Sequence, residues 1–203
     1  MRDDLRFVIK NFIYFLLSGL ICAFVLGSIF MDLHFFNGVP ERKFVECAQE
    51  AMLFFSVLIF FYLAWKKQEA SLWLVGGFLA CMLIRELDVS FDKLAHGSWF
   101  YAALGMAVLC LFKAWKAGTE QMVHSLADFM RSRAFPKLSC GLLIVLVYSR
   151  IIGYKPLWQL VMKKHYLRNV KTVVEEGTEL FGYSIIFLAA VEYACYLLSK
   201  KED

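Results

Sequence analysis

Residues 11–31 read NFIYFLLSGLICAFVLGSIFM, a run with no charged side chain. An α-helix rises about 1.5 Å per residue, so a run of this length covers a hydrocarbon core of about 30 Å. The sequence therefore predicts an all-α fold, a multi-pass transmembrane helical bundle with six spans in a single integral membrane domain over residues 1–203. The other five apolar runs lie at residues 45–65, 70–87, 98–115, 138–154 and 179–198.

The composition also favours a lipid environment. The 203 residues are 60% hydrophobic, include 20 Phe and are 20% charged, whereas soluble domains are about 45–50% apolar and about 25% charged. Runs 70–87 and 138–154 are the least apolar, because the first ends in Arg85 and Glu86 and the second includes Arg150. Five spans plus a re-entrant element are therefore the alternative.

Two connections between the runs are long enough to hold helices of their own. Within residues 119–134, Thr119 can cap a helix whose apolar residues recur at helical spacing. Within residues 157–174, apolar and basic residues share a stretch that follows Pro156. Amphipathic helices of this kind lie in the membrane interface. We therefore predict one interfacial amphipathic helix in each connection.

The distribution of Lys and Arg gives an orientation. With the amino terminus inside, twelve of the 22 basic residues fall on the inner side and ten on the outer side. Basic residues favour the cytoplasmic side of a membrane. The prediction is an integral protein of a bacterial inner membrane with a cytoplasmic amino terminus.

Acidic residues gather at alternate ends of the apolar runs. Because successive spans alternate in direction, these ends are expected at one membrane face. Glu46 and Glu50 are four residues apart at the start of the second run, and Asp92 and His96 repeat that spacing before the fourth. Residues four apart on a helix share a face, and carboxylate oxygens suit divalent metals. The candidate metal ligands are Glu46, Glu50, Glu86, Asp92, His96, Glu176 and Glu179.

This pattern leads to the hypothesis of a membrane-embedded enzyme that acts on a lipid or lipid-linked substrate, in which the cluster holds a divalent metal or a catalytic water. His96 is the candidate general acid or base, and Asp92 and Glu179 complete the catalytic set. Basic side chains would bind an anionic headgroup. The candidate substrate-binding residues are Arg85, Arg150, Lys163, Lys164 and Arg168.

The alternative hypothesis is a non-catalytic membrane component, such as a channel, carrier, sensor or assembly subunit. In it, carboxylates complement the dipoles of helix starts or pair with Arg85 or Arg150, and Glu192 pairs with a Lys of the inner loops. The sequence contains no Walker A, G-x-S-x-G or H-E-x-x-H motif and no soluble basic module for nucleic acid. The expected partners are the bilayer, a lipid substrate, and a second copy or another membrane subunit.

Overall fold

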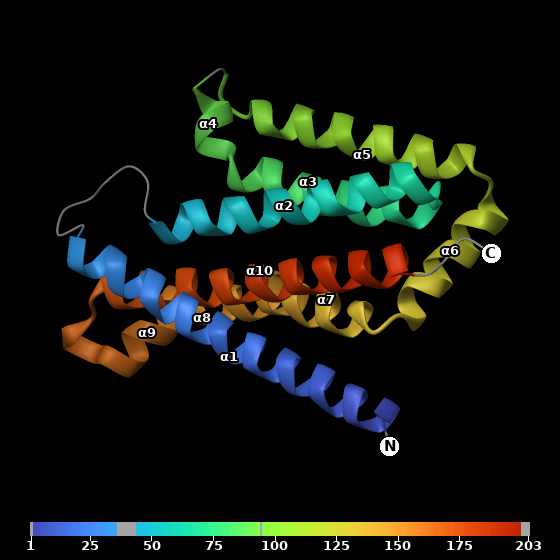
Figure 1. Ribbon diagram of the computed structural model, residues 1–203. Coiled ribbons are helices and arrows are strands. Elements are labelled where there is room, and N and C mark those ends of the chain that lie inside the picture. Colours follow the sequence, from blue (N-terminus) through green and yellow to red (C-terminus); the bar gives the residue numbers. More distant parts are fainter. Residues whose placement is uncertain (1, 36–43, 94, 200–203) are drawn as a thin grey trace. The chain divides into compact units, whose positions relative to one another are not determined.

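The computed structural model describes residues 2–35, 44–93 and 95–199, and these residues form helices joined by short turns, with no strand among them (Figure 1). The all-α prediction is confirmed. Apolar runs without an internal proline favour this outcome, because a helix satisfies its backbone hydrogen bonds within one segment where water is absent.

The chain divides into two compact units. Unit 1 comprises residues 1–47 and 144–181, and unit 2 comprises residues 48–143 and 182–203. The helices α2 (Phe44–Lys67) and α10 (Arg168–Ser199) contribute residues to both units. Whether the two units form the single membrane domain expected from the sequence stays a prediction.

Unit 1 contains a long first helix and a series of short helical segments. After α1 (Arg2–Phe35) and the start of α2 come the π-helix η1 (Ile144–Tyr148), α8 (Ser149–Ile152), α9 (Lys155–Met162), the 3-10 helix η2 (Lys163–His165) and the first part of α10. Helix α10 approaches α1 closely at Gly177, where an added Cβ would lie 2.6 Å from Ile29 Cδ1. A Cβ there would require the Ile29 side chain to shift, so the glycine allows the two helices to approach closely.

Asp32 connects the end of α1 to the start of α2. Its two carboxylate oxygens accept hydrogen bonds from the backbone N–H groups of Phe44 (2.7 Å) and Val45 (3.0 Å). The first N–H groups of a helix have no partner within that helix. Asp32 supplies partners for two of them from twelve or more residues away, which fixes where α2 begins relative to α1.

Unit 2 contains α3 (Ala70–Glu86), α4 (Asp88–Asp92), α5 (Ser98–Lys116), α6 (Thr119–Arg131) and α7 (Ala134–Leu143). Helices α3 and α5 lie side by side (Figure 1), and a Cβ at Gly77 of α3 would lie 2.6 Å from Cys110 Cβ of α5. The hydroxyls of Ser71 and Ser125 form a buried hydrogen bond that joins α3 to α6. Small residues thus allow close helix packing, as is common in membrane proteins.

A buried aromatic cluster forms the core of unit 2. The Phe129 ring of α6 makes edge contacts with Phe60 of α2, Phe135 of α7 and Tyr193 of α10, with centroids between 4.9 and 6.0 Å apart. Edge-to-face geometry suits the charge distribution of aromatic rings. The cluster therefore ties four helices together through one side chain.

Within residues 2–35, 44–93 and 95–199, five helical stretches are long and apolar enough to cross a membrane, so the predicted transmembrane helical character is supported. They are Asp4–Phe35, Phe44–Lys67, Ser98–Lys116, Ala134–Ile152 and Arg168–Ser199. The predicted span at residues 70–87 corresponds to α3, which has 17 residues and reaches only about 25 Å at about 1.5 Å per residue. The count of six spans is not confirmed.

The two predicted interfacial helices have different outcomes. Helix α6 covers Thr119–Arg131, close to the predicted 119–134, and the backbone of the next residue, Ser132, is extended. The predicted helix over 157–174 is wrong as one element. Helix α9 ends at Met162, the next residue Lys163 has a φ of +50°, and the residues from Arg168 onward belong to α10. A left-handed residue such as Lys163 interrupts a right-handed helix. An interfacial location for either segment stays a prediction.

Candidate functional site

Four charged side chains of unit 1 meet between α8 and α10. Arg150 of α8 directs its guanidinium at two carboxylates of α10, with Nη2 3.1 Å from Glu179 Oε1 and Nη1 3.9 Å from Glu175 Oε1. Glu179 is buried, its side chain being 11% exposed, whereas the Arg150 side chain is 44% exposed. The pairing of these carboxylates with Arg150, expected under the alternative hypothesis, is confirmed.

Two further side chains complete this arrangement. Lys171 Nζ pairs with Glu175 Oε2 one turn away on α10. The buried Ser149 hydroxyl lies 2.6 Å from the Val145 carbonyl oxygen and 3.2 Å from Glu179 Oε1, and its single proton is shared between these two acceptors. We call the residues Ser149, Arg150, Lys171, Glu175 and Glu179 the ion-pair network. Its two cations balance its two anions.

Gly153 provides the space that Glu175 occupies. A Cβ at this position would lie 2.2 Å from Glu175 Oε1 and 2.5 Å from its Cδ. The φ of Gly153 is −69°, which any residue adopts, so the requirement at this position is spatial. A larger residue would push Glu175 away from Arg150 and Lys171.

The chemistry of the network favours a structural role. A carboxylate that is neutralised by Arg or Lys is a poor metal ligand, because its lone pairs and its charge are already engaged. Charged groups in a low-dielectric environment are tolerated when they are paired and hydrogen-bonded. The network meets both conditions, and it joins the Ala134–Ile152 span to the Arg168–Ser199 span.

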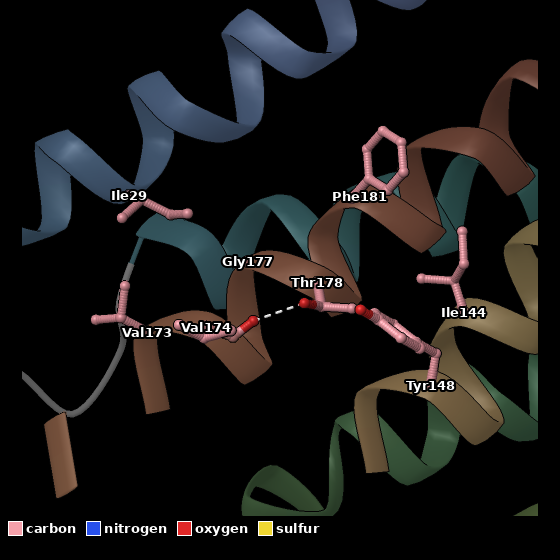
Figure 2. Close-up of a pocket in the computed structure, with 8 residues that line it drawn as sticks. All are labelled: Ile29, Ile144, Tyr148, Val173, Val174, Gly177, Thr178 and Phe181. Carbon is pink, nitrogen blue, oxygen red and sulfur yellow. Dashed lines mark hydrogen bonds between the residues drawn. The ribbon is translucent and has the colours of Figure 1, made fainter. Parts of the chain in front are cut away.

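An open apolar groove of about 420 Å³ lies in unit 1 (Figure 2). Ile29 of α1 and Tyr148 of η1 flank residues of α10, and the Thr178 hydroxyl donates its proton to the Val174 carbonyl oxygen (2.7 Å). The groove thus presents mainly hydrocarbon surface. Its lining residues are Ile29, Ile144, Tyr148, Val173, Val174, Gly177, Thr178 and Phe181.

The predicted Asp92 and His96 pair forms, but the helix that was expected to carry it does not. Helix α4 ends at Asp92, and turns follow it. Asp92 Oδ2 lies 3.4 Å from His96 Nδ1, and Asp92 Oδ1 accepts a hydrogen bond from the Gly97 N–H (2.8 Å). The His96 side chain is 98% exposed. This is the geometry of an exposed turn in which an imidazole lies beside a carboxylate.

Glu86 lies between a tyrosine and its neighbouring arginine. Tyr183 Oη donates a hydrogen bond to Glu86 Oε1 (2.9 Å), and Arg85 Nη1 lies 3.8 Å from the same oxygen. Elsewhere in unit 2, Lys137 Nζ lies 2.5 Å from Glu192 Oε2. The expected structural pairing of Glu192 with a lysine is confirmed.

The helix starts explain only part of the acidic pattern. Glu46 lies in the first turn of α2, as expected for a carboxylate that complements the helix dipole. That explanation is wrong for Glu175 and Glu179, because α10 begins at Arg168 and has no acidic residue in its first turn.

Among the residues that the structure describes, no group of three or more His, Cys, Asp or Glu side chains is placed to hold a metal ion. Glu179 belongs to unit 1, whereas Glu50, Asp92 and His96 belong to unit 2. The metal-ligand roles of Glu46, Glu50 and Glu176, the catalytic set and the shared pocket therefore stay predictions. Of the predicted headgroup-binding residues, Lys163, Lys164 and Arg168 are exposed.

Three residues of the site were not identified from the sequence. The sequence does indicate a role for Lys171, because it precedes Glu175 by four residues and charges at this spacing pair on a helix. No sequence pattern indicates the roles of Ser149 and Gly153, because these roles depend on the contact between α8 and α10.

Two curated proteins are similar to part of the chain, and both are described as "Probable potassium transport system protein Kup". The protein from Chlorobium phaeovibrioides is 32% identical over 76 residues, which cover 36% of this chain and 12% of the relative. The protein from Chlorobaculum tepidum is 29% identical over 84 residues, which cover 40% of this chain and 14% of the relative. The chain thus matches less than a sixth of the length of either relative. No family model and no solved structure matches it.

Proposed function

We propose that the chain is a non-catalytic, multi-pass membrane component of an ion-transport system, in which the ion-pair network holds spanning helices together. The proposal takes up the alternative hypothesis of the sequence analysis. It places the chain in a bacterial inner membrane with a cytoplasmic amino terminus.

The observation that carries the proposal is the state of the unit 1 carboxylates. Glu175 and Glu179 are engaged by Arg150, Lys171 and Ser149, so neither carboxylate is available as a base or a ligand without breaking an ion pair. Removing one member of a buried pair costs about 3–5 kcal/mol.

The two partially matching relatives suggest which kind of function to test. The descriptions of both proteins name potassium transport. This fits a membrane component, and K⁺ is therefore the first ion to test. The matched segments cover 12% and 14% of those proteins, so we propose a membrane component of a transport system for this chain and do not transfer the activity of the whole relatives to it.

The test uses cells that produce or lack the full chain and measures their uptake of K⁺. Uptake is expected to differ between the two. The Arg150→Ala variant is expected to lose the effect together with its membrane abundance, whereas His96→Ala is expected to retain both. Equal uptake with and without the chain would contradict the transport role.

A second measurement addresses catalysis. Purified chain in proteoliposomes is expected to leave the mass of every lipid unchanged. Turnover of a lipid that stops in His96→Ala or Glu179→Gln protein would contradict the non-catalytic assignment and favour the lipid-acting enzyme.

A further inference from the structure

The apolar groove of unit 1 lies among segments that belong to candidate spans. Ile29 is part of the Asp4–Phe35 span, Tyr148 is part of Ala134–Ile152, and Val174 is part of Arg168–Ser199. An open groove between such helices is filled from the hydrocarbon around it, because water gains no hydrogen bonds from apolar walls. An acyl chain is therefore the kind of group that fits the groove.

The segment beside the groove is strongly basic. Residues 151–174 contain five Lys and Arg and no Asp or Glu. Arg150 and Lys171 belong to the ion-pair network, but in the described part of the chain no ion pair reaches Lys163, Lys164 or Arg168, and all three are exposed. Cations of this kind attract phosphate groups.

The same segment exposes apolar side chains. Leu160, Val161 and Leu167 are 77%, 68% and 61% exposed, and Trp158 donates its indole N–H to the Ile152 carbonyl oxygen. Exposed aliphatic residues beside lysines, with a tryptophan nearby, are typical of a segment at the level of the lipid headgroups.

The groove and the basic segment are continuous along α10. Val173, which lines the groove, follows Arg168 by five residues, about 8 Å along the axis at about 1.5 Å per residue. Lys163 and Lys164 precede the same helix end in η2. A single amphipathic ligand can therefore reach both features.

We infer that unit 1 binds one anionic phospholipid, with an acyl chain in the groove and its phosphate at Lys163, Lys164 and Arg168. The inference rests on the proposed membrane component and adds a ligand to it. The lipid would cover the groove between α1 and α10 and offset the positive charge of the segment that joins α9 to α10.

The test is native mass spectrometry of the full chain in detergent, with phosphatidylglycerol and phosphatidylcholine of identical acyl chains. Phosphatidylglycerol is expected to bind at one molecule per chain. The triple variant Lys163→Gln, Lys164→Gln, Arg168→Gln is expected to bind it about 100-fold more weakly, at about fivefold for each removed charge, which is about 1 kcal/mol each. Equal binding of both lipids, or an unchanged triple variant, would overturn the inference.

A charge-matched control removes three cations from unit 2. The variant Lys66→Gln, Lys67→Gln, Lys116→Gln is expected to bind phosphatidylglycerol as the unmodified chain does. A loss as large as that of the first triple variant would show that binding follows net charge alone, and this would overturn the assigned site.

The groove is tested separately by filling it. Val174→Trp is expected to weaken the binding of phosphatidylglycerol at least tenfold, whereas Val108→Trp, on an exposed position of α5, leaves it unchanged. Soluble glycerol phosphate is expected not to compete. Full competition by glycerol phosphate, or unchanged binding in Val174→Trp protein, would overturn the acyl-chain part of the inference.

The same spectra separate this inference from the proposed function. A bound lipid of unchanged mass supports both. Cleavage products of a bound lipid would refute the non-catalytic function while supporting the lipid site.

Discussion

The Arg150–Glu179 pair gives the sharpest quantitative prediction about stability. At 3.1 Å and an effective dielectric constant of about 20, Coulomb's law gives about 5 kcal/mol as an upper bound. Arg150 is 44% exposed, so solvent screens much of that attraction. Exposed pairs contribute about 0–1 kcal/mol, and breaking a buried pair costs about 3–5 kcal/mol. We expect Arg150→Ala to lower the free energy of unfolding by about 2 kcal/mol.

Replacing Arg150 should lower the free energy of unfolding more than replacing Glu179. Arg150→Ala removes the guanidinium that lies 3.1 Å from the buried Glu179 carboxylate, whereas Glu179→Gln leaves a half-exposed arginine that solvent and Glu175 can still neutralise. Glu179→Gln should therefore cost about 1 kcal/mol, a typical net value for one hydrogen bond. The double variant should cost less than the sum, with a coupling energy of about 1 kcal/mol.

The assay is reversible unfolding of the purified full chain in mixed detergent micelles, followed by circular dichroism. The matched control is Arg168→Ala, an exposed arginine of the same unit with no ion pair among the described residues, which should change stability by less than about 0.5 kcal/mol. Additive losses in the double variant, or equal losses in Arg150→Ala and Arg168→Ala protein, would refute the reasoning.

The remaining predictions concern close packing and a helix cap. Gly153→Ala should cost about 1–3 kcal/mol by the same assay because its Cβ would overlap Glu175, and a full cost that persists in Glu175→Ala protein would contradict this cause. Gly141→Val should prevent accumulation of folded protein in the membrane, because a Cβ there would lie 2.9 Å from the Gly182 backbone oxygen. The control is Gly19→Val, because no atom lies within 4 Å of a Cβ at that position. Equal abundance of the two variants would be inconsistent with this packing. Asp32→Ala should cost about 1 kcal/mol through loss of the α2 cap, with an unchanged free energy of unfolding as the contrary result.

The length of the apolar runs was enough to predict the helices, but not all of their ends. Hydropathy does not identify the start of α10 at Arg168, because residues 168–178 mix basic, acidic and apolar side chains. The spacing of Lys171 and Glu175 is the local sign that the helix extends toward its amino terminus. The break at Lys163 has no comparable sign, since lysine is a good helix former and its positive φ is set by the surrounding chain.

The site was predicted in its residue types and only partly in its partners. Arg150 and Glu179 were both named from the sequence, and their pairing was one of two competing explanations. Spacing along a helix cannot decide between an ion pair and a metal ligand, because the choice depends on which side chain a second helix brings close. Ser149 and Gly153 belong to the site only because of that packing, and no local sequence pattern predicts them.

The central claim is that cations, and not a metal ion, hold the unit 1 carboxylates. The most direct measurement is the divalent-metal content of the full chain, purified in detergent without chelators and analysed by inductively coupled plasma mass spectrometry beside Glu179→Gln protein. The account predicts substoichiometric metal in both samples. A stoichiometric divalent ion that is lost from the Glu179→Gln protein would contradict it.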